Sequence, residues 1–248
     1  MRIYETHRYE KAAACWREIV DKGASDIFAI RTLAFSLYYS SEFDAARYYF
    51  DQALERNPQD LLSLKGKGLL ALTTVQFQEA EAIFAETIRL APRNEQWRRL
   101  YGVALQRQGR FEEALAAFDD ALQLNPKSVS AWSLKGAALF RIERYDEAMR
   151  AFDRIIEIDP TSEIAWRNKG SCLIRAGKPE EAIQMFDVAL QINPLSVEAV
   201  YNRGVALERL GRIDEAREHY ERTLRINSDY TEAQRALDLL SRRGPDGG

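Results

Sequence analysis

Apolar and polar residues follow helical spacing through the middle of this chain. Trp132, Gly136 and Leu139 stand at i, i+4 and i+7, so they share one face of a helix. Ser128 comes directly before this pattern, where a side-chain oxygen can cap the first backbone N–H groups. The pattern therefore predicts a first helix that begins at Val129.

A second helix is predicted a few residues further along. Asp146 and Glu147 supply the negative charge that the start of a helix favours, because the helix dipole is positive there. Ala148 and Phe152 begin an apolar face, and Pro160 ends the helix because proline cannot continue the backbone hydrogen bonds. Residues 129–162 thus predict a helix–turn–helix unit.

This unit recurs along most of the chain. Prolines stand 34 residues apart, at Pro58, Pro92, Pro126, Pro160 and Pro194. An alanine recurs at the same interval, at Ala46, Ala80, Ala114, Ala148, Ala182 and Ala216. An aromatic residue follows each alanine by four positions, at Phe50, Phe84, Phe118, Phe152, Phe186 and Tyr220. A fixed period of this size predicts stacked units forming one elongated domain, an architecture that binds other chains more often than it catalyses reactions.

Glycines mark close approaches and turns. One position of the first helix is glycine in five copies of the unit, at Gly68, Gly102, Gly136, Gly170 and Gly204. A glycine inside a helix costs up to about 1 kcal/mol in propensity, so we expect a site without room for a side chain. We expect the alanine of the second helix to face it, with the aromatic residue filling the space toward the following repeat. Gly109, Gly177 and Gly211 suit a left-handed turn between the two helices.

These residues resemble the tetratricopeptide repeat (TPR) pattern, W-x2-L-G-x2-Y…A-x3-F…P. Trp132, Gly136, Ala148, Phe152 and Pro160 meet it, and the frame fits residues 27–230 without insertion. The resemblance implies an all-α, right-handed superhelical solenoid of helix-turn-helix repeats. The six expected repeats are 27–60, 61–94, 95–128, 129–162, 163–196 and 197–230.

The frame has two departures from the family pattern. The leucine before the glycine is replaced by a basic residue at Lys67, Lys135, Lys169 and Arg203. In the third repeat Trp97 stands one place early, and Arg98 occupies the usual position of the tryptophan.

The two ends differ from the repeats. Residues 1–26 read as a partial repeat with only its second helix, over 7–22, which leaves Trp16, Ile19 and Val20 less covered than their counterparts. Such an end can self-associate, or Ile3 and Tyr4 can fold back over neighbouring apolar residues. Residues 231–243 read as a capping helix with outward Gln234, Asp238 and Ser241, and 244–248 as a disordered tail.

Composition narrows the function classes. Apolar residues make up 46% and charged residues 29%, the net charge is -3, and no apolar run is long enough to cross a bilayer. We expect a cytoplasmic protein with no nucleic-acid partner and no membrane partner. The two cysteines, Cys15 and Cys172, lie several repeats apart at packing positions, so we expect reduced and mostly buried thiols.

Little in the sequence indicates an enzyme. His7 and His219 have no second histidine at metal-ligand spacing and read as solvated surface residues. The Lys65-Gly-Lys-Gly segment lacks the spacing of a phosphate loop. Pairs of acidic residues recur with the repeat, which indicates helix-start charges. We therefore expect no catalytic residues, no metal and no cofactor.

The resemblance implies that the first helices line a concave peptide groove through the second, fifth, ninth, twelfth and thirteenth residues of each repeat. The expected groove residues are Arg31, Phe35, Tyr38, Lys65, Leu69, Arg99, Arg107, Arg141, Arg167, Arg175, Asn202 and Arg209. Eight positive charges face only two negative ones, Glu198 and Glu208. The first two repeats add apolar residues, including Phe28 and Leu62.

Two interpretations of the groove arginines stay open. Each arginine can pair with a neighbouring carboxylate and serve only the fold, or the row can attract an acidic or carboxylate-ended peptide. The clamp with which chaperone-binding relatives hold a carboxylate needs an Asn where Phe35 stands, so a dedicated clamp is not expected.

The sequence thus predicts a non-catalytic protein–protein interaction scaffold that binds a peptide segment of a partner, with an acidic segment as one alternative. A second hypothesis is a self-associating module, a homodimer formed through Trp16, Ile19 and Val20. A third is RNA binding by helical repeats, against which stand the TPR frame and the acidic net charge.

Overall fold

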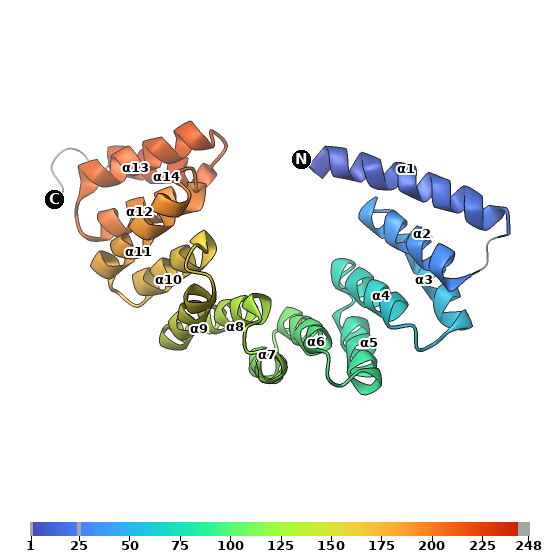
Figure 1. Ribbon diagram of the computed structural model, residues 1–248. Helices are drawn as coiled ribbons and strands as arrows, with labels where there is room; N and C mark the ends of the chain where they lie inside the picture. The colour runs from blue at the N-terminus through green and yellow to red at the C-terminus, as the bar shows by residue number, and fades with distance from the viewer. Residues whose placement is uncertain (1, 24–25, 243–248) are drawn as a thin grey trace. The chain divides into compact units, whose positions relative to one another are not determined.

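The computed structural model describes residues 2–23 and 26–242, with side chains from His7 onward. Within those ranges the chain forms fourteen α-helices and no strand. The helices follow one another through short turns (Figure 1). The first seven are α1 (Arg2–Asp21), α2 (Ile27–Tyr39), α3 (Phe43–Arg56), α4 (Leu61–Thr73), α5 (Phe77–Leu90), α6 (Glu95–Arg107) and α7 (Phe111–Leu124). The others are α8 (Val129–Arg141), α9 (Tyr145–Ile158), α10 (Glu163–Arg175), α11 (Pro179–Ile192), α12 (Val197–Arg209), α13 (Ile213–Ile226) and α14 (Thr231–Arg242).

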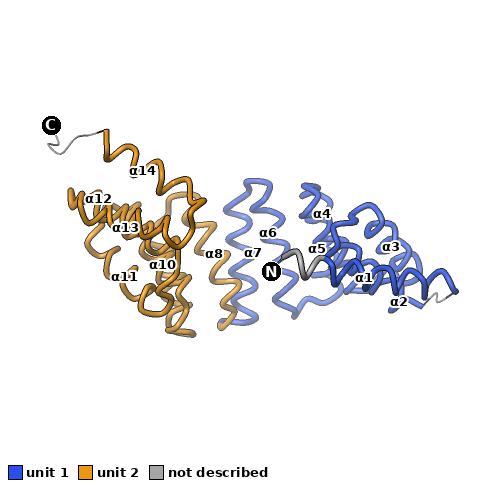
Figure 2. Tube along the Cα trace, turned by 90° about the horizontal axis from the view of Figure 1, so that it is seen from above, with its two compact units in different colours: residues 1–126 blue, residues 127–248 orange. Residues whose placement is uncertain are grey.

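The helices group into two compact units, residues 1–126 and residues 127–248 (Figure 2). In each unit every helix packs against the next one in the chain. First helices also touch each other, α2 against α4 in the first unit and α10 against α12 in the second. Apolar clusters therefore continue from one helix pair into the next.

Side chains cap the first helices at a recurring position. Asp26, Asp60, Asn94, Ser128 and Ser196 accept hydrogen bonds from backbone N–H groups in the first turn. The predicted Ser128 cap is confirmed, with its Oγ 3.3 Å from the Ala131 nitrogen. The second helices α3, α5, α7, α9 and α11 each end two residues before a repeat proline, because the residue before a proline avoids helical dihedrals.

The turns between the two helices of a repeat need a left-handed residue. The prediction for Gly109, Gly177 and Gly211 is confirmed, since their φ angles are 80°, 77° and 73°. The same position holds non-glycine residues in the other three repeats, with φ of 68° at Ser41, 63° at Val75 and 63° at Glu143. The following residue donates its N–H to a carbonyl five residues back in all six turns, as in a Schellman motif.

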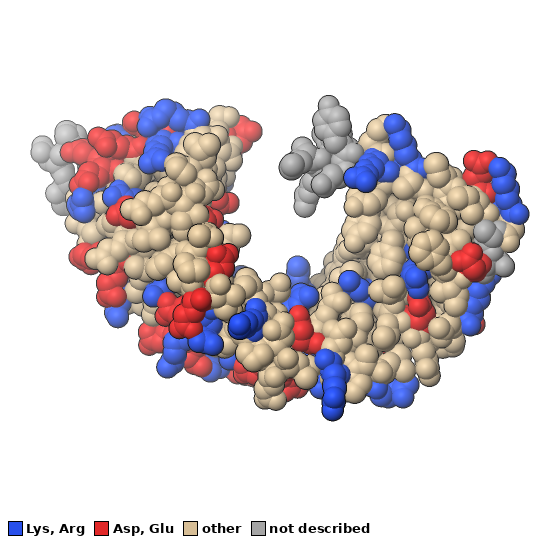
Figure 3. Space-filling view, in the orientation of Figure 1, with Lys and Arg blue, Asp and Glu red and all other residues tan. Residues whose placement is uncertain are grey.

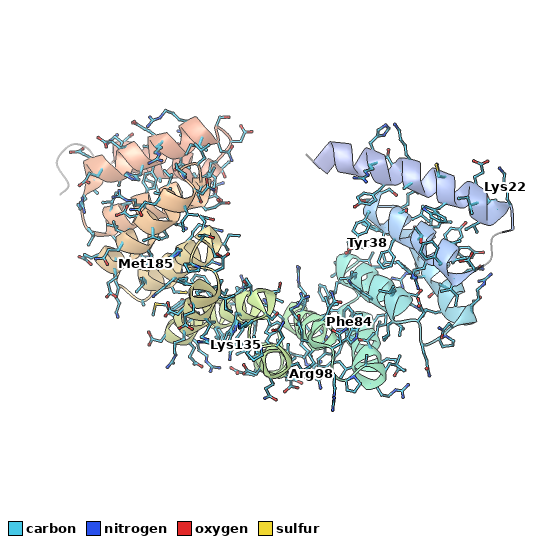
Figure 4. The ribbon with its side chains drawn as sticks, in the orientation of Figure 1. Lys22, Tyr38, Phe84, Arg98, Lys135 and Met185 are labelled. Carbon is cyan, nitrogen blue, oxygen red and sulfur yellow. The ribbon has the colours of Figure 1, made fainter. Side chains whose placement is uncertain are left out.

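The partner of the recurring glycine differs from the prediction. A Cβ added at Gly136 would lie 2.7 Å from the Phe152 ring, and Gly68 faces Phe84 in the same way (Figure 4). The glycine therefore makes room for the aromatic ring of its own repeat and not for the alanine. Phe50 differs from the other aromatic residues, because its ring lies against Gly66 on α4, the first helix of the following repeat.

The basic residues that replace the family leucine have a structural role. Lys67 reaches Asp51 at 2.6 Å, Lys169 reaches Asp153 at 2.6 Å, and the Arg203 Nε reaches Asp187 at 2.7 Å. In each case the two residues stand 16 positions apart, on a second helix and the first helix that follows it. These ion pairs link consecutive repeats.

The shifted tryptophan of the third repeat leaves the local packing intact. Trp97 is only 3% exposed. Arg98 donates from Nη1 to the Pro92 carbonyl at 2.7 Å, the bond that the Trp166 indole N–H makes to the Pro160 carbonyl at 2.9 Å. Arginine thus replaces the hydrogen bond of the tryptophan at this position.

The structure corrects two expectations about the first helix. The helix α1 begins at Arg2 and not at residue 7, so the backbone of residues 2–6 continues it and does not fold back. The side chains of Ile3 and Tyr4 lie outside those described, as does the predicted tail at 244–248. Cys15 is exposed on α1, whereas Cys172 is buried as predicted. At the other end Gln234, Asp238 and Ser241 of α14 are exposed, in agreement with the sequence.

Candidate functional site

Three of the predicted groove arginines are held by carboxylates. The Arg31 Nη1 donates to both oxygens of Asp60, at 2.9 and 3.0 Å, and both side chains are mostly buried. Burial alone would raise the pKa of Asp60, but hydrogen bonds from Ser63 and Arg31 outweigh burial and hold the pKa below its usual value. Because Asp60 also caps α4, Arg31 serves the packing of α2 on α4.

Arg99 and Arg167 occupy the same repeat position as Arg31. The Arg99 Nε lies 3.6 Å from Glu95, and the Arg167 Nε lies 3.2 Å from Glu163, each one turn earlier on the same helix. The pairing interpretation thus describes the arginines at this position. Lys65 stands at the same position on α4, is half-buried, and has no ion-pair partner among the residues the structure describes.

In the first unit the exposed face of α2 and α4 is largely apolar and aromatic. Phe35 packs edge-on against Phe50 at 5.0 Å, and the Tyr38 hydroxyl lies 3.0 Å from Thr73 Oγ1 on α4 (Figure 4). Leu69 is half-buried against the cluster beneath α4. Beside them, Phe28 is 60% and Leu62 47% exposed. Over α1–α4 the face in view in Figure 3 is mostly uncharged, whereas charges of both signs interleave over α9–α14.

An arginine ends each of the first helices α6, α8, α10 and α12, and its environment differs among these four repeats. Arg209 donates to the Ile174 carbonyl at 2.6 Å, and the Arg175 Nε donates to the Tyr145 hydroxyl at 3.2 Å. Arg107 of the first unit and Arg141 of the second are exposed and have no hydrogen-bond or ion-pair partner within the described part of the chain. These two guanidinium groups are available to a ligand.

A pocket of about 270 Å³ lies between α8 and α10 of the second unit. We name it the α8–α10 pocket, and it is lined by Ala137, Phe140, Arg141, Phe152, Asn168 and Ser171. Asn202 of α12 borders it, because its Nδ2 donates to Ser171 Oγ at 3.4 Å. Of this set the sequence interpretation named only Arg141 and Asn202. It missed Asn168, which stands at the same repeat position as Asn202 and makes no side-chain hydrogen bond to any described residue.

The α8–α10 pocket has a cause that is visible in the sequence. The ninth residue of each repeat points to this face, and in four repeats it is large: Phe35, Leu69, Val103 and Val205. In the fourth and fifth repeats it is Ala137 and Ser171. These two neighbouring small side chains leave an opening above Phe152. A comparison of this position between the repeats could have predicted the pocket from the sequence.

The N-terminal surface is partly covered. Trp16 is half-buried, with its ring edge-on to Phe28 at a centroid distance of 5.8 Å. Val20 is also half-buried against the α2–α3 cluster, whereas Ile19 is 43% exposed. Trp16, Ile19 and Val20 therefore do not form one uncovered face. The exposed apolar residues of this surface are Ile19 and Phe28.

The rest of the described chain offers little reactive chemistry. No three His, Cys, Asp or Glu side chains among the described residues are placed to hold a metal ion. None of the helices that the structure describes is both long enough and apolar enough to span a bilayer. His7 is exposed as predicted.

The prediction for His219 is wrong, since this side chain is half-buried. Its Nδ1 donates to the Glu215 carbonyl at 2.9 Å, so its Nε2 accepts from the Arg203 guanidinium at 2.7 Å. Burial lowers the pKa of His219, and the nearby charges of Arg203 and Arg222 lower it further. His219 is therefore a neutral hydrogen-bond acceptor in the packing of α13 on α12.

Comparison with protein families identifies the class of this protein. The tetratricopeptide repeat model matches residues 31–95, 101–163 and 173–231, and a second tetratricopeptide repeat model matches residues 151–184. The matches span most of the chain. The chain belongs to the tetratricopeptide repeat family.

Solved structures support the same fold. YrrB, described as a TPR protein with an unusual peptide-binding site, is 24% identical, with a TM-score of 0.57 over 76% of this chain and 97% of its own. MamA from Desulfovibrio magneticus RS-1 is 20% identical, with a TM-score of 0.62 over 68% and 96%. A tetratricopeptide repeat protein from Parabacteroides merdae is 16% identical, with a TM-score of 0.67 over 94% and 98%. At these identities the likeness concerns the fold alone. Among curated proteins, none matches this sequence.

Proposed function

We propose that this protein is a non-catalytic scaffold that binds a peptide segment of a partner protein on the exposed faces of its first helices. In this proposal α2–α13 form the six repeats with the boundaries given above, and α14 caps the last one. The observation that carries it is the presence of Lys65, Arg107 and Arg141 on these faces without any partner in the described chain. The family and the peptide-binding relative YrrB support the same class of function.

The two units differ in the kinds of ligand residue that they favour. In the first unit, exposed Phe28 and Leu62 favour apolar side chains, because exposed apolar surface commonly marks a partner site. In the second unit, Arg141 and Arg175 favour carboxylates, which an arginine can bind through two parallel hydrogen bonds. The proposed partner segment therefore carries acidic residues.

Selection from a displayed library of random short peptides on the full chain tests this function. We expect enrichment of acidic peptides whose affinity falls as salt rises, since exposed charges are screened over about 8–10 Å near physiological ionic strength. Reversing Arg141 and Arg175 to Glu should weaken binding sharply. The matched control reverses Arg225 and Arg235, two exposed arginines on α13 and α14, and should leave it unchanged. A selection without enrichment contradicts the proposal.

Self-association is a second candidate, favoured by the exposure of Ile19 and Phe28 at the N-terminal surface. Two copies meeting there would bury both side chains and form a closed two-fold dimer. Sedimentation over a wide concentration range tests it. We expect weak dimerisation that Ile19→Glu and Trp16→Glu both abolish with little loss of helicity. A wild-type chain that stays monomeric throughout contradicts it.

A further inference from the structure

We infer that the α8–α10 pocket receives one large apolar side chain of the bound segment while Arg141 binds an acidic side chain next to it, an assignment that rests on the peptide-binding function proposed above. It gives the ligand a short recognition element, a large apolar residue within one or two positions of Asp or Glu. The argument has three steps, from shape, from charge and from the contrast with the neighbouring repeats.

The pocket has the size and lining for one side chain. At about 270 Å³ it lies below the roughly 300–1,000 Å³ of pockets that hold small organic ligands. Phe140, Ala137 and the buried Phe152 ring supply an apolar interior. Sites of this kind hold the buried aromatic or aliphatic anchors that contribute most of the affinity at protein interfaces.

The rim of the pocket determines the charge of the residue next to the anchor. Arg141 lines the pocket, is exposed, and has no carboxylate partner among the described residues. The neighbouring Arg175 differs, because it lies over the Tyr145 ring at 5.9 Å and contacts Glu143 at 3.7 Å. Arg141 is thus the free positive charge beside the apolar opening, and a carboxylate complements it.

The other first helices show what a filled position looks like. Leu69 of α4 and Val205 of α12 occupy the place of Ala137 and Ser171. A leucine at residue 137 is therefore compatible with a repeat of this family and would occupy the opening. Because Ala137 is exposed, the added side chain can enter the pocket without displacing the helix core.

The test uses displayed peptides selected on the full wild-type chain after depletion on the Ala137→Leu variant. We expect the surviving peptides to share a large apolar residue next to Asp or Glu. In solution, Ala137→Leu should weaken their binding by about tenfold or more, the loss expected when one large apolar side chain can no longer be buried. Arg141→Gln should weaken acidic peptides selectively. The controls are Gln191→Leu and Arg225→Gln, at exposed positions of the second helices α11 and α13.

Each contrary result has a distinct meaning. Peptides that bind wild type and Ala137→Leu equally, or a depleted selection that yields nothing while an undepleted one succeeds, overturn the pocket assignment and leave the scaffold function standing. Failure of the undepleted selection contradicts both. A sedimentation change on Ala137→Leu would assign the pocket to a second copy of this chain and overturn the inference.

Discussion

Val75→Gly should stabilise this protein through the backbone alone. Val75 has a φ of 63° in the turn between α4 and α5, where three other repeats place glycine. For a residue with a side chain the left-handed conformation costs roughly 1–2 kcal/mol, and β-branched residues are genuine outliers there. Val75 is also 68% exposed, so little packing offsets the cost.

The expected magnitude follows from two opposing terms. Relief of the left-handed strain is reduced by the greater freedom of glycine in the unfolded chain, which is worth about 0.4–1 kcal/mol. The net gain is about 1 kcal/mol in the free energy of unfolding. For a chain of this size that raises the midpoint of thermal unfolding by about 2–4 °C.

Two further variants identify the cause. Val75→Ala removes the exposed apolar side chain but keeps a Cβ at positive φ, so it should gain much less. Gly109→Val should lose stability by a comparable amount, and a Cβ at Gly109 meets no atom within 4 Å, so a clash of the added Cβ is not the reason. The measurements are urea and thermal unfolding followed by circular dichroism. Equal gains from Val75→Gly and Val75→Ala would refute the backbone explanation.

Other substitutions test the packing, the buried histidine and the thiols. Gly136→Val should cost about 1–3 kcal/mol or more by overpacking, and an unchanged urea midpoint would show that the ring facing it can yield. Because the pKa of His219 is lowered on folding, the unfolded chain binds this proton more readily, so stability should fall as pH drops below about 6.5. His219→Gln should flatten that slope between pH 7.5 and 5, and a variant with the same slope as the wild type would contradict the assignment. Burial raises the pKa of Cys172 to about 12, so only Cys15 should react with a thiol reagent before unfolding. Rapid modification of both thiols in the native protein would be the contrary result.

The sequence predicted the helices well because each repeat contains its own residues that start and end helices. The prolines ended the second helices and Ser128 capped α8, and six copies of one pattern reinforced one another. The left-handed turn was predicted where the residue is glycine. It was missed at Val75 and Glu143, because neither residue type indicates a positive φ. Only their alignment with the glycines of other repeats could have shown it.

The candidate site was harder to predict because the same repeat position can hold a paired side chain in one repeat and an unpaired one in the next. Arg141 and Arg175 stand at the same repeat position, yet Arg175 contacts Tyr145 and Glu143 whereas Arg141 has no partner among the described residues. The pocket was also missed in the sequence, because it forms where the side chains of Ala137 and Ser171 are too small to fill the space. The glycine was assigned to alanine because small residues suggest small partners, whereas the space is taken by an aromatic ring reaching across from the second helix.

The ion pairs between consecutive repeats have a consequence for how such a chain can change its length. Asp153 is matched by Lys169, and Asp187 by Arg203, with the same spacing of 16 residues. A duplicated segment of 34 residues in this region contains one such acid and one such base. Its acid can pair with the base of the repeat that follows, and its base with the acid of the repeat before it. Deletion of one such segment rejoins an acid to a base in the same way. This part of the chain can therefore gain or lose a module by recombination without leaving an uncompensated charge at the new junction.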